Sequence, residues 1–161
     1  MPAMSRAKVG DAVPQFSLTA DDGSQVSSDS MRGRRYALYF YPQDDTPGCT
    51  TQACSLRDNW DRVSATGVEV FGVSPDTVRS HVKFRAKYDL PYPLLADPGH
   101  VTADAFGVWV EKEARGKRYM GIERTTFVID PEGRIEHVLP QVKPVEHVDL
   151  LLDALAQASL A

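Results

Sequence analysis

The alternation of apolar and polar residues predicts a hairpin at the start of the chain. Pro14 to Thr19 alternates between the two classes, and the turn residues Asp21-Asp22-Gly23 separate it from a second short extended run, Gln25 to Ser27. Period-two alternation on one side of such a turn, with an extended run on the other, is typical of two paired strands. We therefore expect an N-terminal β-hairpin.

Two nearly continuous apolar runs follow, and each leads to a helix. Arg35 to Tyr41 and Val68 to Val73 are apolar enough to be strands buried on both faces. After the first run, apolar residues at three- and four-residue spacing predict a helix from about Cys49 to Ala65. After the second, Ser74-Pro75 supplies an N-cap and a first-turn proline for a helix that reaches about Tyr88.

The rest of the chain continues this alternation of strands and helices. Leu94 to Ala96 predicts a short strand and Pro98 to Phe106 a short helix. Ile122 to Ile129 and Arg134 to Leu139 predict a hairpin, and Pro144 opens an amphipathic helix. Strands joined through helices need right-handed crossovers and a parallel sheet, whereas a hairpin adds an antiparallel pair. We therefore expect an α/β protein, a three-layer α/β/α sandwich with a mixed central sheet.

Composition and charge limit the classes of partner that we expect for the protein. The chain has 161 residues, of which 42% are hydrophobic and 25% charged, so we expect a single globular domain over residues 1–161. A formal net charge of -4 argues against a nucleic-acid partner, and we interpret the basic stretches Arg32 to Arg35 and Lys112 to Arg118 as solvated loop charge. No stretch has the pattern of a signal peptide or a membrane span, so we expect a cytoplasmic protein with no membrane partner.

Two cysteines, Cys49 and Cys54, are the main candidates for chemistry. The cytoplasm keeps thiols reduced, so any pairing of the two is interpreted as transient rather than structural. Pro47 and Gly48 put Cys49 in the first turn of its helix, with Thr46 placed as the N-cap. The unpaired amides and the dipole of a helix N-terminus favour a thiolate over a thiol.

The helix terminus alone does not account for a fully reactive cysteine. It stabilises an anion by at most about 2 kcal/mol, so we infer a second cationic or hydrogen-bonding contribution, for which an arginine is the natural candidate. The alternative is that Cys49 is only a small buried residue and Thr46 only a helix cap.

The spacing of the cysteines constrains how they can pair. Five helical positions separate two α-carbons by about 8.5 Å and by about 140° around the axis. A disulfide needs the α-carbons within about 7 Å. A bond between Cys49 and Cys54 therefore requires the first helical turns to melt, which permits a redox switch and forbids a static link. The alternative for Cys54 is a cysteine that merely faces the core.

Two adjoining segments carry a resemblance to a known family. The segment Pro42-Gln43-Asp44-Asp45-Thr46-Pro47-Gly48-Cys49 resembles the Pro-x-x-x-Thr-x-x-Cys signature of peroxiredoxins. Its continuation, Thr50 to Asp58, is similar to the bacterioferritin-comigratory protein branch, also called peroxiredoxin Q. The likeness extends over nearly the whole chain and includes Gly10 to Phe16, Gly72 to Asp76 and Phe127 to Asp130.

This resemblance implies a thioredoxin-like fold with an N-terminal extension. It also implies a thiol-dependent peroxidase that reduces hydrogen peroxide and organic hydroperoxides in antioxidant defence. Cys49 would be the peroxidatic cysteine and Cys54 the resolving one. Thr46 and Pro42 would shape the peroxide pocket, and Arg124 matches the family's pocket arginine. The alternative for Arg124 is a surface ion pair at the start of a strand.

The implied cycle runs through a Cys49 sulfenic acid and a Cys49–Cys54 disulfide, and needs no metal or organic cofactor. The Thr46 hydroxyl, the Cys49 amide and an arginine guanidinium would hold the two peroxide oxygens. Thioredoxin, glutaredoxin or another dithiol protein would complete the cycle as reductant. We expect a monomer, with a dimer as the alternative.

Two other classes of function use the same residues. A thioredoxin-type oxidoreductase would share the fold, but the chain has no Cys-x-x-Cys pair and no proline at the strand entry Thr125-Thr126. A non-enzymatic redox sensor could signal through the same helix-melting step. The histidines show no metal-ligand spacing, and we assign no catalytic role to His81, His100, His137 or His147.

Overall fold

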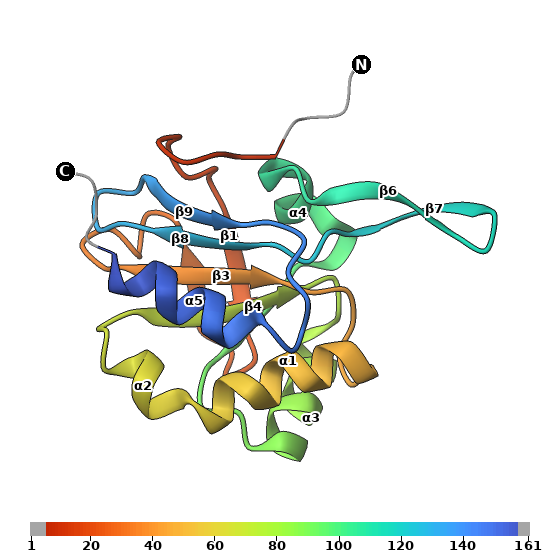
Figure 1. Cartoon of the computed structure of the whole chain (residues 1–161), viewed down its shortest axis with the longest axis horizontal. Coiled ribbons are helices and arrows are strands. Elements are labelled where there is room, and N and C mark those ends of the chain that lie inside the picture. The colour runs from red at the N-terminus through yellow and green to blue at the C-terminus, as the bar shows by residue number, and fades with distance from the viewer. Residues whose placement is uncertain (1–5, 158–161) are drawn as a thin grey trace.

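The computed structural model describes residues 6–157 (Figure 1). Strands and helices alternate along the chain, and the last described element is a helix. The elements are β1 (Ser17–Ala20), β2 (Gln25–Ser27), β3 (Tyr36–Phe40), α1 (Pro47–Asp58), α2 (Trp60–Ser64), β4 (Glu69–Ser74), α3 (Val78–Tyr88), β5 (Leu94–Ala96), η1 (Pro98–His100), α4 (Val101–Phe106), β6 (Trp109–Ala114), β7 (Lys117–Ile122), β8 (Thr126–Ile129), β9 (Ile135–Leu139) and α5 (His147–Ala156).

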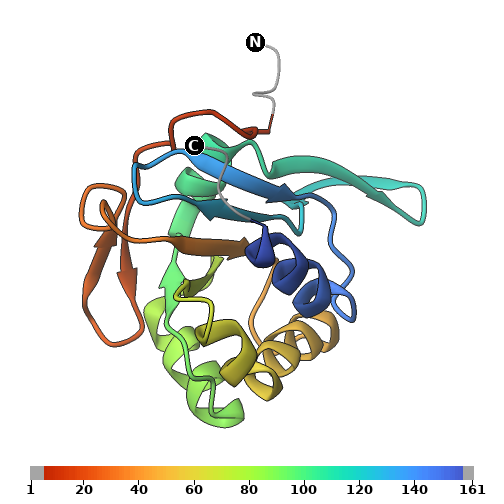
Figure 2. The same cartoon turned by 60° about the vertical axis from the view of Figure 1, so that its left-hand side comes forward.

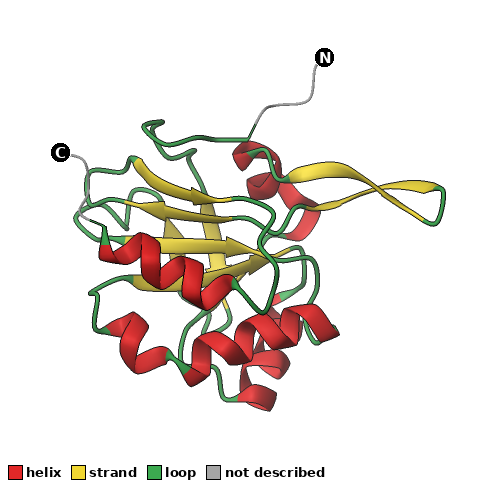
Figure 3. Cartoon of the chain, viewed as in Figure 1, coloured by secondary structure: helices red, strands yellow, loops and turns green. Residues whose placement is uncertain are grey.

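Seven strands form the central sheet in the order β2-β1-β5-β4-β3-β8-β9 (Figure 3). The inner strands β5, β4 and β3 are parallel, because helices connect them. Antiparallel pairs flank them on both sides, with β1 and β2 beside β5, and β8 and β9 beside β3. The predicted mixed sheet and the N-terminal hairpin are confirmed.

Helices cover both faces of this sheet, as a three-layer arrangement requires. On one face, Leu56 of α1, Phe84 of α3 and Leu151 of α5 pack into one apolar cluster. On the other face, Phe106 of α4 packs with the aromatic side chains of the sheet. Figures 1 and 2 show α1, α2, α3 and α5 together, with α4 apart from them. Within residues 6–157, no helix is both long and apolar enough to cross a bilayer.

The helix predicted from Cys49 to Ala65 is in fact two helices, and the expectation of one continuous helix is wrong. α1 ends at Asp58 and α2 begins at Trp60, with Asn59 between them at φ -110° and ψ 18°. The Asn59 side chain donates to the carbonyl oxygen of Ser55 at 2.9 Å. Asparagine competes in this way for backbone groups at helix ends, so a local side-chain bond interrupts an otherwise continuous apolar stripe.

Three other predicted starts shift along the chain. Thr77 rather than Ser74 caps α3, because the Thr77 hydroxyl accepts from the Ser80 amide at 3.1 Å, while Ser74 ends β4. β8 begins at Thr126, four residues later than predicted. α5 begins at His147, three residues after Pro144.

The basic stretch Lys112 to Arg118 is not a loop, and that interpretation is wrong. It belongs to the two-stranded hairpin of β6 and β7, whose turn residues Arg115 and Gly116 both have positive φ. Two such residues in succession give a turn whose twist matches paired strands. The hairpin projects from the rest of the fold in Figure 1.

Candidate active site

The segment between β3 and α1 carries the motif found in the sequence. β3 is buried along its whole length and ends at Phe40. The half-buried Pro42 then begins a loop that enters α1 at Pro47. A proline at the first position of a helix is well tolerated, because the N–H that it lacks would have no intrahelical partner. The loop thus delivers Cys49 to the first turn of α1.

Thr46 occupies the N-cap position of α1, but its side chain makes no capping hydrogen bond. Its hydroxyl instead donates to the carbonyl oxygen of Gln43 at 2.9 Å. The capping role predicted for the Thr46 side chain is therefore wrong. The hydroxyl closes the loop, and its oxygen keeps a lone pair with which to accept a further hydrogen bond.

Cys49 lies near the start of α1 and is only 2% exposed. The amides of Gly48 and Cys49 precede the first intrahelical bond, which runs from the Thr50 amide to the Thr46 carbonyl at 2.8 Å. The sulfur therefore belongs to the turn in which unpaired N–H groups and the helix dipole favour an anion. Because the sulfur is buried in the apolar cluster of α1 and α5, it is surrounded by protein groups rather than by water.

Arg124 reaches this sulfur from the segment between β7 and β8. Its Nη2 lies 3.4 Å from Cys49 Sγ, although the two residues are far apart in sequence. Its carbonyl oxygen accepts from the Val142 amide at 2.8 Å, which fixes the backbone beneath the side chain. The guanidinium therefore adds a cation and N–H donors to the end of the helix.

Gly48 makes room for this arginine. A Cβ at position 48 would stand 3.3 Å from Arg124 Nη2 and 3.4 Å from Pro144 Cγ. The first distance is shorter than ordinary van der Waals contact, and the second lies at its lower limit. A glycine before Cys49 thus permits the close approach of the guanidinium to the sulfur.

Gln52 is a site residue that the sequence reasoning missed. It is fully buried, and its Oε1 accepts from Arg124 Nη1 at 2.5 Å. Residues three apart share a helix face, so Gln52 and Cys49 hold the two ends of one guanidinium. Its Nε2 has no hydrogen-bond partner among the described residues. The signal for it in the sequence was a polar residue at i+3 from the cysteine, on the apolar stripe of the helix.

Cys54 lies further along α1, half-buried, and both cysteines are free thiols. The structure keeps Cys49 and Cys54 on one helix and does not bring them together. The hydrogen bond from Arg57 to Asp58 raises the pKa of that arginine, and negative charge on Cys54 raises it further. Arg57 also donates to the Tyr88 carbonyl at 2.7 Å, which ties this end of α1 to α3.

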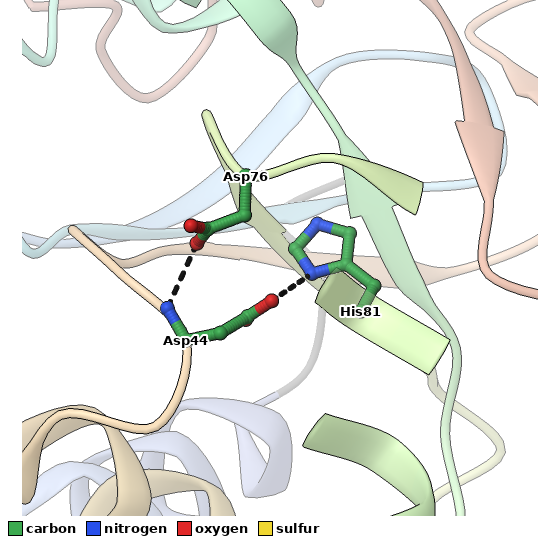
Figure 4. A group of neighbouring side chains, drawn as sticks. All are labelled: Asp44, Asp76 and His81. Carbon is green, nitrogen blue, oxygen red and sulfur yellow. Dashed lines mark hydrogen bonds and ion pairs between the residues drawn. The ribbon is translucent and has the colours of Figure 1, made fainter. Parts of the chain in front are cut away.

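A network of polar side chains fixes the loop in front of Thr46 (Figure 4). Asp44 is buried, and its carboxylate accepts from the Tyr41 hydroxyl at 2.6 Å and the Ser80 hydroxyl at 2.8 Å. His81 Nδ1 lies 2.7 Å from the same carboxylate, and His81 Nε2 lies 2.9 Å from the carbonyl oxygen of Leu95, to which it must donate. A proton therefore lies between His81 Nδ1 and Asp44, and the two side chains form a buried hydrogen-bonded pair.

The same cluster offers three ligand atoms that could hold a cation. One such atom each from Asp44, Asp76 and His81 lies within 4.8 Å of the others. Asp76 Oδ2, however, accepts from the Asp44 amide at 2.8 Å and from the Ser74 hydroxyl at 2.6 Å. All three side chains are thus engaged by protein groups, and hydrogen bonding accounts for the cluster. Its role is to fasten the loop to β4 and α3.

His147, at the start of α5, lies close enough to Arg124 to be affected by its charge. It is fully buried, and burial together with the nearby Arg124 charge lowers its pKa to about 3. Its Nε2 lies 2.8 Å from the Thr126 hydroxyl. The histidine is therefore neutral at ordinary pH and adds no charge to the site.

The chain is similar in sequence and in structure to known proteins. Residues 9–138 match the AhpC/TSA family. The chain is 45% identical to peroxiredoxin Bcp of Escherichia coli, over 96% of this chain and 99% of the relative, and 43% identical to peroxiredoxin Bcp of Bacillus subtilis, over 94% and 97%. It also resembles the solved bacterioferritin comigratory protein of Xanthomonas campestris, studied for alkyl peroxide reduction, with a TM-score of 0.84 and 34% identity over 94% of this chain and 97% of that one.

Proposed function

The chain belongs to the AhpC/TSA family, among its Bcp peroxiredoxins, and on this premise we propose that Cys49 is the peroxidatic cysteine and Cys54 the resolving cysteine. The protein is a thioredoxin-fold peroxidase that uses a peroxide and a thiol reductant. The observation that carries the residue assignment is the contact of 3.4 Å between Arg124 Nη2 and Cys49 Sγ at the start of α1.

In the first step, the Cys49 thiolate attacks one oxygen of the hydroperoxide. An S–O bond forms as the O–O bond breaks, so the sulfur is oxidised to a sulfenic acid and the peroxide is reduced to water or an alcohol. The departing oxygen takes up a proton. Arg124 and the amides of Gly48 and Cys49 stabilise the negative charge that passes from the sulfur to that oxygen.

Thr46 takes part as an acceptor. Because its proton goes to the Gln43 carbonyl, its oxygen is free to accept the O–H of the attacked peroxide. That contact and the Arg124 donors would align the O–O bond with the sulfur. Pro42, at the start of the same loop, contributes shape rather than a polar group.

In the second step, the Cys54 thiolate attacks the Cys49 sulfur: the S–S bond forms as the S–O bond breaks, and the departing hydroxide takes up a proton and leaves as water. Both cysteines lie on α1, where helical geometry holds their α-carbons too far apart for a disulfide. The first turns of α1 must therefore unwind. Buried Cys49 then moves outward to meet the half-buried Cys54.

A dithiol protein of the thioredoxin or glutaredoxin type restores the thiols by exchange with the Cys49–Cys54 disulfide. The substrates that we propose are hydrogen peroxide and organic hydroperoxides, because alkyl peroxide reduction was studied in the relative from Xanthomonas campestris. We further propose a single domain that acts as a monomer in the cytoplasm. Light scattering of the reduced and oxidised protein tests the oligomeric state.

Peroxide consumption by cysteine variants tests the assignment. Cys49→Ser should lose turnover with a thioredoxin system. Cys54→Ser should consume about one equivalent of peroxide and then stop, because the sulfenic acid has no resolving partner. Mass spectrometry of the oxidised wild-type protein should show the intramolecular disulfide. Full turnover by Cys49→Ser, or turnover without that disulfide, would refute the proposed mechanism.

A further inference from the structure

Two buried tyrosines are hydrogen-bonded to each other and to α1. Tyr39 is on β3, and Tyr92 lies in the segment between α3 and β5; each is 1% exposed. Their hydroxyl oxygens are 2.9 Å apart, and Tyr92 donates to the carbonyl oxygen of Ala53 on α1 at 3.1 Å. The two side chains therefore connect the sheet to the helix that carries both cysteines.

The direction of these hydrogen bonds follows from the number of protons. A phenol has one O–H, and burial raises the pKa of both tyrosines, so both hydroxyls keep their protons at ordinary pH. A carbonyl can only accept, so the Tyr92 proton goes to Ala53. Tyr39 must then donate to the Tyr92 oxygen. The result is a directed chain of hydrogen bonds that ends on the backbone of α1.

Gly72 and Trp60 define the space that the two phenols occupy. β4 pairs with β3 in parallel, with Gly72 beside Tyr39, and a Cβ at position 72 would stand 2.9 Å from the Tyr39 hydroxyl oxygen. The glycine thus permits the close approach of the phenol to β4. On the other side, the indole ring of Trp60 packs against Tyr92, with ring centroids 5.6 Å apart. Neither hydroxyl can turn away without losing its partner in the interior.

Ala53 occupies a central position between the two cysteines of α1. In an α-helix the amide of residue i bonds to the carbonyl of residue i−4, so the Ala53 amide closes the helical ring on Cys49. The Ala53 carbonyl shares one planar peptide unit with the Cys54 amide. Its helical partner is the Arg57 amide, so the bond from Tyr92 is additional to those that the helix needs.

Formation of the disulfide requires this peptide unit to move. The α-carbons of Cys49 and Cys54 are too far apart on a regular helix, so the helical ring between them must open. When it opens, the peptide unit before Cys54 leaves its helical orientation, and the Ala53 carbonyl turns away from Tyr92. The Tyr92 hydroxyl then loses its acceptor inside the fold, which adds to the free energy of opening.

We propose that Tyr92 is a positioning residue for the resolving step, and that its hydrogen bond to Ala53 sets the balance between the folded and the unwound form of α1. This inference rests on the proposed roles of Cys49 and Cys54. In the folded helix, the Cys49 sulfenic acid meets only peroxide. In the unwound helix, it meets Cys54. The tyrosine therefore influences which of two reactions follows the first oxidation.

The competition between these two reactions reports the role of Tyr92. Attack by the Cys54 thiolate forms the S–S bond and breaks the S–O bond, and the departing hydroxide takes up a proton and leaves as water. Attack of the sulfenic acid on a second peroxide forms another S–O bond as the O–O bond breaks. The sulfur is then oxidised to a sulfinic acid, and the peroxide is reduced to water or an alcohol. The ratio of disulfide to sulfinic acid at a given peroxide concentration therefore measures the rate of resolution.

Tyr92→Phe is the test, because it keeps the ring against Trp60 and removes only the hydroxyl. One net hydrogen bond corresponds to about a fivefold change in an equilibrium constant, so disulfide formation should be about five times faster. The peroxide concentration that converts half of the protein to the sulfinic acid, measured by mass spectrometry without reductant, should rise by the same factor. The first reaction with peroxide, followed in a Cys54→Ser background, should not change, because the contact between Cys49 and Arg124 remains.

Two variants separate the bond to Ala53 from the general loss of a buried hydroxyl. Tyr39→Phe removes the bond between the tyrosines and leaves the one to Ala53, so resolution should change by less than about twofold. Tyr36→Phe removes a buried hydroxyl on the same strand, one with no hydrogen-bond partner among the described residues, and should leave resolution unchanged.

Hydrogen exchange of the reduced protein gives a second measurement that needs no peroxide. The amides of Ala53 and Cys54 should exchange about fivefold faster in Tyr92→Phe than in the wild type, because the helical ring opens more often. The amides of α3 should exchange at the same rate in both proteins. Equal acceleration in α1 and α3 would indicate a general loss of stability and would count against the proposal.

The proposal is overturned if Tyr92→Phe and the wild type give the same ratio of disulfide to sulfinic acid, or if Tyr36→Phe shifts the ratio as much. It is also overturned if Tyr92→Phe forms more sulfinic acid, because the hydroxyl would then assist resolution. Failure of the underlying function looks different. Turnover by Cys49→Ser, or a wild type that forms no internal disulfide, would refute the assignment of the cysteines, whatever Tyr92 does.

Discussion

Arg124 is held by geometry as much as by charge. One nitrogen of its guanidinium meets Cys49 Sγ at 3.4 Å and another meets Gln52 Oε1 at 2.5 Å, so both are committed to α1. A planar guanidinium with two fixed contacts cannot turn without losing one of them. With Cys49 as the proposed peroxidatic cysteine, the reactivity of its sulfur should depend on small displacements of this one side chain.

Replacing Gly48 with alanine tests that dependence. The new Cβ would lie 3.3 Å from Arg124 Nη2 and push the guanidinium aside by a few tenths of an ångström. We expect the second-order rate constant with peroxide to fall by about tenfold, since misplacement of a positioning group by about 1 Å can cost a hundredfold. Stability should not fall, because alanine favours a helix more than glycine does. Stopped-flow kinetics and denaturation measure the two effects.

Thr51→Ala is the matched control, because Thr51 is exposed on the same helix. It should leave the rate constant unchanged. Equal rates in Gly48→Ala and Thr51→Ala would mean that the close approach of Arg124 to position 48 has no influence on the reaction.

At the scale of elements, side-chain hydrogen bonds fix the loop before α1 to α3 and β4. Asp44 and His81 form a buried pair that joins this loop to α3, and Asp76 extends the network to β4. α1 can then unwind from Thr46 onward while the loop stays in place. Removal of either partner should be costly, because the other then keeps a buried polar group with one hydrogen bond fewer.

His81→Leu should therefore lower the free energy of unfolding by about 2 kcal/mol, because the buried Asp44 carboxylate loses one partner and keeps only the Tyr41 and Ser80 hydroxyls. Urea denaturation of the reduced protein measures the change. The control is Lys87→Met, which breaks an exposed pair between the same helix and the same loop, with Asp45. Exposed pairs contribute under about 1 kcal/mol. Similar losses in both variants would contradict the importance of the buried pair of Asp44 and His81.

Local patterns predicted most elements, and they failed where a strand carries many charged residues or where contacts join residues far apart in the sequence. Buried strands and the helices between them follow from apolar periodicity, and the motif around Cys49 led to Arg124. The hairpin of β6 and β7 was missed because most residues from Glu111 to Arg118 are charged, and its pairing depends on the turn at Arg115 and Gly116. The hydrogen bond between Asp44 and His81 was missed because the two residues are far apart in the sequence, and no helical or strand periodicity brings them together.

At the scale of the whole molecule, His147 makes the free energy of unfolding depend on pH in the acid range. Its pKa in the fold is about 3, well below the ordinary value of about 6.5 in an unfolded chain. The unfolded state therefore binds a proton that the folded state refuses. Stability from this group is complete above about pH 6.5 and falls as the pH drops toward 3, by roughly 2 kcal/mol at pH 5.

His147→Gln should remove this part of the pH dependence. Unfolding free energies of the wild type and the variant, measured across the acid range, should converge as the pH falls, because the variant has no imidazole to protonate. A His147→Gln slope parallel to that of the wild type would rule out the buried neutral imidazole.

The gap between α1 and α2 at Asn59 limits how far a redox event can spread. Val63 of α2 is fully buried and stays anchored in the interior, while the turns that carry the cysteines belong to a separate helix. In the proposed cycle, each turnover therefore unwinds only a short segment of α1, while the rest of the fold stays in place. An enzyme that must meet its oxidant again and again thereby avoids exposing its interior, and with it the risk of aggregation, every time it works.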